Sequence, residues 1–179
     1  MKSLDFSQNY FELFGLRPEF NLDAEHLHAQ QQQLLASCHP DRFVNASDRE
    51  KRLSVQMASW VNQANATLCD PVKRAAYLLQ VNGVEAGDES ETTSDTGFLM
   101  EQIELREEIE ACRSGDDALP CCDQVSLKLE HKASLLAQEF VSHFAAMDLE
   151  AARISGRKMQ FIQRIQQQLS DLQFELEDS

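Results

Sequence analysis

The sequence predicts an all-α fold, with an N-terminal helical hairpin and a C-terminal three-helix bundle. Only 6 Gly and 4 Pro, the residues least compatible with a helix interior, occur among its 179 residues. Hydrophobic residues make up 42% of the chain, which is enough to build a packed core. Between these glycines and prolines, apolar side chains recur at the spacing of one helix face.

The first half is expected to hold a short apolar segment, residues 10–16, and three helices. Helices begin at residues whose side chains accept from the first backbone N–H groups, and they end at glycine or before proline. The signals that end or begin these segments are Gly15 with Pro18, Asn21, His39-Pro40-Asp41, the capping box Ser47 to Glu50, Asp70-Pro71 and Gly83.

The second half is expected to hold three longer helices, roughly 96–113, 123–146 and 149–177, the last two capped by Asp123 and Asp148. In the last helix the apolar positions step by three and four, the seam of a helical bundle, at Ile162, Ile165, Leu169, Leu172 and Leu176. Residues 83–95 (GVEAGDESETTSD) have the composition of a solvated connector. We therefore place domains at 1–82 and 96–179, with the connector at 83–95.

The net charge is −14, and it is divided very unequally: residues 1–82 carry −1 and residues 83–179 carry −13. A strongly acidic chain is poorly suited to nucleic acid or to an anionic membrane, because both are bound through clustered Lys and Arg. The charge therefore predicts protein partners, and a different partner for each half.

The cysteine pattern and the start of the chain predict a cytoplasmic protein. The five cysteines form no C-x-x-C pair, which is typical of reduced thiols, and no secretory signal is visible at the first residues. No stretch reaches the roughly 18 apolar residues of a membrane span.

The tripeptide His39-Pro40-Asp41 stands between two amphipathic helices. Pro40 stiffens the loop, while His39 and Asp41 offer a hydrogen-bonding ring and a carboxylate. Such a rigid polar corner suits docking, although a proline that ends one helix and an aspartate that caps the next would leave the same pattern.

The order of motifs around this tripeptide resembles the J-domain of DnaJ-type co-chaperones. The second half extends the likeness to nearly the whole chain, and the family it resembles is HscB, the J-proteins of iron–sulfur cluster assembly. The segments that carry the resemblance are Tyr10–Leu16, His39-Pro40-Asp41-Arg42-Phe43, Asn62-Gln63-Ala64, Leu68 to Leu79, Phe98–Gln102 and Glu104–Glu108.

This resemblance implies an L-shaped co-chaperone that is not itself an enzyme and that carries neither cofactor nor metal. Its J-domain would bind the Hsp70-type chaperone HscA and stimulate its ATPase through His39, Pro40, Asp41 and Arg42. One departure matters, because the helix before the tripeptide carries no Lys or Arg. We therefore expect weaker and less salt-sensitive binding than in basic J-domains.

Helix 96–113 has a second apolar face. Phe98, Leu105, Ile109 and Cys112 form the stripe expected to face the core, whereas Leu99, Met100 and Ile103 lie on the other side among glutamates. Apolar residues ringed by carboxylates suggest a protein-binding patch, although a helix buried on two sides would show the same pattern.

The resemblance implies that this face binds the scaffold IscU. The matching positions are Leu99, Met100, Ile103, Glu104 and Glu107, with Phe161 in the last helix as an aromatic contributor that could equally be structural.

Three alternatives stay open from the sequence. The first is a general J-protein for unfolded clients, although the Gly/Phe-rich linker and C-x-x-C repeats of DnaJ are missing. The second is a metal- or cluster-binding protein that uses Cys112, Cys121, Cys122 and His131, although their spacing is not that of zinc sites. The third is a purely structural helical adaptor.

Overall fold

The computed structural model describes residues 7–44, 46–85, 95–114 and 117–178. These residues form helices and loops, with no strand among them, and none of these helices is long and apolar enough to cross a membrane. The chain divides into two compact units, Met1–Gly83 and Val84–Ser179. The all-α prediction is confirmed.

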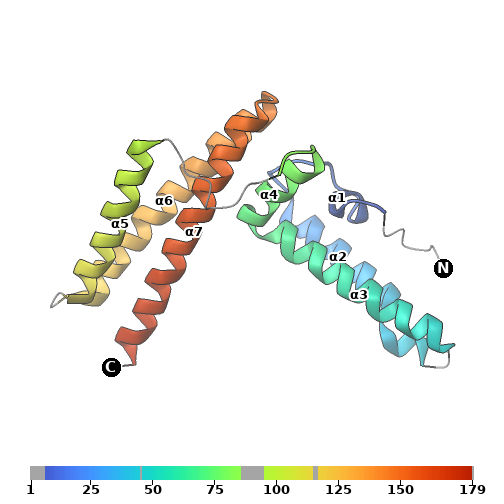
Figure 1. Cartoon of the computed structure of the whole chain (residues 1–179). Helices are drawn as coiled ribbons and strands as arrows, with labels where there is room; N and C mark the ends of the chain where they lie inside the picture. Colours follow the sequence, from blue (N-terminus) through green and yellow to red (C-terminus); the bar gives the residue numbers. More distant parts are fainter. Residues whose placement is uncertain (1–6, 45, 86–94, 115–116, 179) are drawn as a thin grey trace. The chain divides into compact units, whose positions relative to one another are not determined.

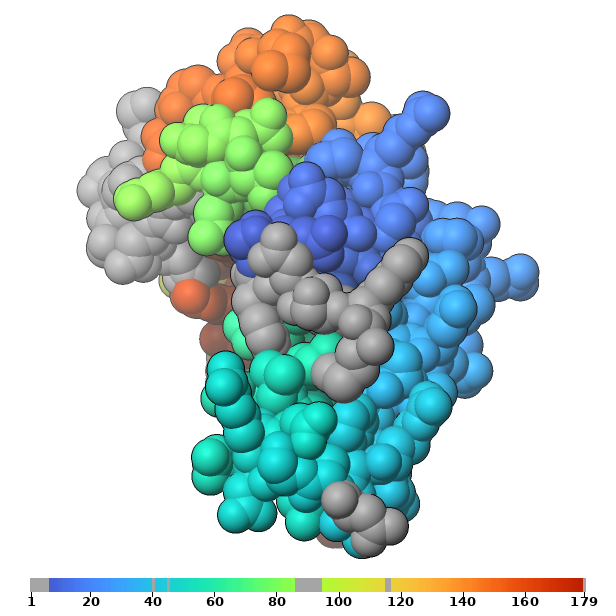
Figure 2. Space-filling view, turned by 90° about the vertical axis from the view of Figure 1, so that its right-hand side faces the viewer, coloured from blue at the N-terminus to red at the C-terminus, as the bar shows by residue number. Residues whose placement is uncertain are grey.

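Unit 1 contains the short helices α1 (Tyr10–Leu13) and η1 (Pro40–Phe43) and the longer helices α2 (Ala24–Cys38), α3 (Asp48–Cys69) and α4 (Pro71–Val81). Helices α2 and α3 pack along each other, and α1 and α4 pack on α3 (Figure 1). Figure 2 shows α2 and α3 side by side, with the turn between them at the lower end of the view.

The core of unit 1 is built from the apolar faces that the helical spacing predicts. The fully buried side chains include Phe11, Phe14, Val61, Leu68, Leu78 and Leu79. The Tyr77 hydroxyl accepts a hydrogen bond from the backbone N–H of Tyr10 (2.9 Å), and the two rings stack at 4.4 Å. Burial raises the pKa of Tyr77. Tyr77 therefore fastens α1 to α4.

Arg74 joins the end of α3 to α4. Its guanidinium donates to the Leu68 carbonyl (2.6 Å) and lies over the Phe20 ring, 4.8 Å from the centroid. Burial lowers the pKa of this arginine. Leu68, Arg74 and Tyr77, which belong to the segment that carries the resemblance, thus support the fold of unit 1.

Unit 2 consists of α5 (Thr96–Ser114), α6 (Ala118–Ala145) and α7 (Leu149–Glu177). The two long helices α6 and α7 pack closely, and α5 packs against both (Figure 1). Small buried residues on α7, Ala152, Ser155 and Gly156, leave room for this close packing. The predicted seam is buried at Ile162, Ile165, Leu169 and Leu172 and half-buried at Leu176.

The predicted caps are largely confirmed. The Ser47–Glu50 capping box is present, Asp70 accepts from the N–H groups of Val72 and Lys73, and Asp148 accepts from that of Ala151. Gly83, with φ of 78°, follows the end of α4 in a conformation that glycine adopts without strain.

Two caps are placed differently from the prediction. Asp23, and not Asn21, caps α2, because its carboxylate accepts from the His26 N–H three residues later (3.0 Å). Helix α6 begins at Ala118 and not after Asp123, because Pro120 lies in the first turn, where no N–H is needed. Asp123 lies inside α6 and accepts from the Gln173 amide on α7 (3.1 Å).

Candidate functional site

The corner between α2 and η1, made by His39, Pro40, Asp41 and Arg42, is fixed by local hydrogen bonds. His39 has an extended backbone (φ −60°, ψ 129°), as a residue before proline requires. Its Nδ1 accepts a hydrogen bond from the Asp41 N–H (3.3 Å) and so caps η1. Because Nδ1 accepts, the neutral ring carries its proton on Nε2, which leaves that N–H to donate to a partner.

The charged and polar side chains of the corner face solvent. The side chains of His39 and Asp41 are 57% and 87% exposed, and the Asp41 carboxylate lies 3.6 Å from Nδ1 of His39. Arg42 is also exposed, and its Nη1 donates to the Ala36 carbonyl (3.0 Å) near the end of α2. The arginine thus holds η1 against α2, and the short rigid segment presents an imidazole and a carboxylate to solvent.

Cys38, next to the corner, is not a nucleophile paired with His39. Its thiol is 1% exposed, and burial raises its pKa, which disfavours the reactive thiolate. The Sγ donates to the Leu35 carbonyl (3.7 Å), so the side chain belongs to the core of the hairpin.

The first turns of α3 carry exposed cations, although the helix before the corner carries no Lys or Arg. Arg49, Lys51 and Arg52 are all exposed and follow the corner directly along the chain. The signal that could have found them is the run of Lys and Arg just after the capping box.

The α5 ridge, made by Leu99, Met100, Ile103, Glu104 and Glu107, lies on the solvent-facing side of α5. Leu99, Met100 and Ile103 are 39%, 60% and 51% exposed, and both glutamates are exposed. The opposite stripe is buried, as predicted, at Phe98, Leu105, Ile109 and Cys112. The alternative of a helix buried on two sides is therefore wrong for the described part of unit 2.

Ion pairs flank the ridge and leave its own carboxylates available. Glu101 pairs with Lys132, and Glu108 pairs with Lys128 (2.5 Å), so α5 is held to α6 by acids beside the ridge. Glu104 and Glu107 make no ion pair within the residues that the structure describes. These two carboxylates can therefore meet cations of another molecule.

Phe161 on α7 lies beneath the helix that carries the ridge. It is 9% exposed and packs edge-on against Phe98, with ring centroids 5.4 Å apart. The Arg106 guanidinium lies 5.6 Å from the Phe161 centroid. The structure thus places Phe161, predicted to contribute to scaffold binding, in the α5–α7 interface, where it packs against the buried side of α5 and not in the ridge itself.

The N-terminal end of α5 is anchored by Asp95. Its Oδ1 accepts from the Phe98 N–H (3.0 Å), and its Oδ2 accepts from Lys158 on α7 (2.7 Å). The Lys158 hydrogen bond, followed by that of Phe98, lowers the pKa of the Asp95 carboxyl below its ordinary 3.8. The anchor therefore contributes stability above that ordinary value and loses it as the pH falls through the lower folded value.

We expect Asp95→Asn to keep the cap and remove the pairing with Lys158. The melting temperature at neutral pH should fall by a few degrees, since exposed pairs contribute little, and acid should destabilise the variant less steeply than the parent chain. Thermal melts of both proteins between neutral and acidic pH test this. If the melting temperatures of the two proteins fell equally steeply as the pH was lowered, the proposed anchor would be contradicted.

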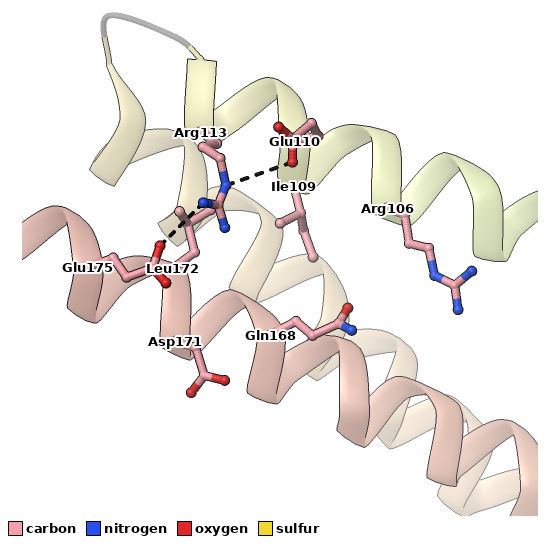
Figure 3. Close-up of a pocket in the computed structure, with 8 residues that line it drawn as sticks. All are labelled: Arg106, Ile109, Glu110, Arg113, Gln168, Asp171, Leu172 and Glu175. Atoms are coloured by element: carbon pink, nitrogen blue, oxygen red, sulfur yellow. Dashed lines mark hydrogen bonds and ion pairs between the residues drawn. The ribbon is translucent and has the colours of Figure 1, made fainter.

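A polar groove lies between α5 and α7 toward the C-terminal end of each helix (Figure 3). Its lining comes from α5 and α7: Arg106, Ile109, Glu110, Arg113, Gln168, Asp171, Leu172 and Glu175. Arg113 pairs with Glu110 (3.7 Å) and with Glu175 (3.3 Å), so most of its charge is matched inside the groove. The Arg113–Glu175 pair links α5 to α7 at this end, whereas the Arg113–Glu110 pair lies within α5.

The expectation that all cysteines are reduced thiols is wrong for Cys112 and Cys121, which form a disulfide. The two residues are nine apart in sequence, and the packing of α5 against α6 brings their Cα atoms to 5.4 Å, within disulfide range. A search for C-x-x-C spacing cannot detect such a pair.

The disulfide also weighs against a cysteine-based metal or cluster site. It occupies two of the four residues that such a site would use, and Cys122 is buried while His131 is exposed. Within the described ranges, no group of three His, Cys, Asp or Glu side chains is placed to hold a metal ion.

Comparison with known sequences assigns both halves of the chain to one family. A family model, the HSCB C-terminal oligomerisation domain, matches residues 94–170. The co-chaperone protein HscB homolog of Shewanella halifaxensis (strain HAW-EB4) is 38% identical over 174 residues, covering 95% of this chain and 99% of that protein.

Solved structures agree with the sequence match. The chaperone HscB from Vibrio cholerae superposes with a TM-score of 0.84 at 35% identity, covering 94% of this chain and 99% of that one. Human co-chaperone protein HscB has a TM-score of 0.86 at 28% identity, with 93% and 82% covered. The full-length sequence match, the shared fold and the exposed corner together show that this chain belongs to the HscB family of co-chaperones.

Proposed function

We propose that the chain is an adaptor that binds the iron–sulfur scaffold protein IscU, delivers it to the Hsp70-type chaperone HscA and stimulates the ATPase of that chaperone. The adaptor works in the cytoplasm and is not itself an enzyme. The observation that carries this proposal is that an exposed polar corner and an exposed apolar ridge stand on two different units.

The corner suits the task of triggering an ATPase in another protein. The Asp41 carboxylate is 87% exposed and stands on a segment stiffened by Pro40 and by the His39 cap, so it can pair with an arginine of the chaperone at little entropic cost. Binding of this kind favours one conformation of the chaperone over another, and hydrolysis then follows in the chaperone.

The ridge suits a partner with an apolar patch bordered by basic residues. Met100 adapts its shape readily, and the half-exposed Leu99 and Ile103 add apolar area. Glu104 and Glu107 supply charges that are not ion-paired among the described residues, and the net charge of −13 in residues 83–179 attracts a basic surface from a distance.

Single-turnover ATP hydrolysis by HscA tests the proposal directly. The chain alone should stimulate hydrolysis, and scaffold added together with the chain should stimulate it more than the two separate effects predict, because one molecule holds both partners. Purely additive rates would contradict the adaptor role.

Binding to the chaperone should depend only weakly on salt. Helix α2 carries no Lys or Arg, so the Lys and Arg charges near the corner are confined to Arg42 and the start of α3. Raising the salt from about 50 to about 300 mM should weaken binding only a few-fold. A loss of a hundredfold or more in such a titration would contradict this expectation.

A further inference from the structure

The Cys112–Cys121 disulfide joins the C-terminal end of α5 to the first turns of α6. At the opposite end of α5, Asp95 is bound to Lys158 of α7. The α5 ridge lies between these two fastenings, and it is the surface that the proposed function assigns to the scaffold. Whether the bond at the C-terminal end of α5 exists depends on the oxidation state of Cys112 and Cys121.

The two sulfurs differ in how easily a small thiol reaches them. Cys112 is 1% exposed and forms part of the buried stripe of α5, whereas Cys121 is half-buried. A reductant or oxidant from solution therefore meets Cys121 first. Cys112 lies behind it, already within bonding range.

The neighbouring thiol does not compete with this pair. Cys122 follows Cys121 directly but is completely buried in the core of unit 2. Burial, and to a smaller extent the nearby Asp123, raises the pKa of Cys122, so little thiolate forms there. Of the remaining cysteines, Cys38 is buried and Cys69 is exposed, and both lie in unit 1.

We propose that Cys112 and Cys121 form a redox-modification site, reversibly oxidised by a low-molecular-weight disulfide such as glutathione disulfide, that controls how firmly the α5 ridge is held. A disulfide in a cytoplasmic protein is seldom a permanent structural bond and is more often redox-responsive. This inference rests on the proposed function for its cytoplasmic setting and for its effect on scaffold binding, whereas thiol exchange at the two sulfurs can be measured independently of that function.

The exchange balances in two steps. The Cys121 thiolate attacks glutathione disulfide, whose S–S bond breaks, and one glutathione leaves as a thiolate that takes up a proton. Cys112 then attacks the Cys121 sulfur, the protein disulfide forms, and the second glutathione leaves. Two protein thiols have lost two protons and two electrons, and one glutathione disulfide has become two glutathiones.

The bond should stabilise unit 2 and keep the ridge in its binding conformation. Closing a loop of this size removes conformations from the unfolded chain, and we expect reduction to lower the melting temperature by roughly 10 °C. The freed end of α5 must be ordered again when the scaffold binds, so we expect reduction to weaken scaffold binding roughly fivefold.

Thiol counting on the full chain in graded glutathione buffers tests the site. After an acid quench, unfolding and alkylation, peptide mapping should show all five cysteines labelled in reducing buffer; in oxidising buffer Cys112 and Cys121 should be unlabelled and cross-linked to each other, whatever mixed disulfide the exposed Cys69 forms with glutathione. Cys112→Ser should abolish the cross-link and the change in melting temperature, and it should leave Cys121 as a mixed disulfide with glutathione in oxidising buffer, whereas the matched control Cys122→Ser should keep the cross-link and the change in melting temperature. Five labels in every buffer, or a cross-link to Cys122, would overturn the site.

A binding arm separates this inference from the proposed function. Scaffold affinity is measured for the oxidised chain, the reduced chain and Cys112→Ser in both buffers. Weaker binding on reduction of the parent chain alone supports the inference. Equal binding in both states overturns the control of the ridge and leaves the proposed function standing, whereas no binding in either state overturns the proposed function.

Discussion

Replacing His39 with glutamine is expected to remove the stimulation of the chaperone's ATPase and leave scaffold binding unchanged. His39 both caps η1 through its Nδ1 and offers its Nε2–H to a partner, and the longer, more flexible glutamine cannot do both in one conformation. A loss of at least about tenfold in stimulation corresponds to the loss of one good charged or polar contact.

The matched control is His26→Gln, which changes an exposed histidine near the start of α2, far from the corner. Because His39 is 57% exposed, neither variant should lower the melting temperature appreciably. Single-turnover hydrolysis at saturating adaptor, with scaffold affinity measured on the same preparations, separates the two effects. Full stimulation by His39→Gln would show that the corner is not the trigger.

Truncating the α5 ridge should weaken scaffold binding and leave the stimulation of the chaperone's ATPase unchanged. The double variant Leu99→Ala, Met100→Ala removes two side chains that are 39% and 60% exposed in the free protein and that the proposal buries against the scaffold. At roughly 1–2 kcal/mol each for central interface positions, we expect scaffold affinity to fall between about 30-fold and about 700-fold.

Leu127→Ala on α6 provides the control for this variant, because Leu127 is a leucine of the same unit that is 66% exposed and lies off the ridge. Both proteins should melt near the parent temperature and should stimulate the chaperone normally in the absence of scaffold. Unchanged scaffold affinity in the folded double variant would remove the assignment of this face.

Helix faces and most caps could be predicted from the sequence, because both depend on neighbours a few residues apart. The split of α5 into a buried stripe and an exposed apolar ridge follows from side-chain spacing alone, and so do the caps at Ser47, Asp70 and Asp148. The position of the corner could also be predicted, because a proline between two amphipathic helices places the tripeptide in the loop that joins them.

The structure differs from the prediction where parts of the chain that are far apart in sequence pack against each other. The burial of Phe161 under α5 and the Cys112–Cys121 bond both depend on how α5 lies against α6 and α7, which helical spacing does not describe. Helix α6 begins at Ala118, before the predicted start at residue 123, because proline is well tolerated in a first turn, where Pro120 lies.

The central claim is that the corner and the ridge are separate surfaces that can hold two partners at once. The most direct test is to measure the affinity of the chain for its scaffold without the chaperone and with saturating ATP-bound chaperone. We predict that affinity is unchanged or tighter when the chaperone is present. Progressive weakening of scaffold binding as chaperone is added would mean that the two partners compete for one surface, and would contradict the account.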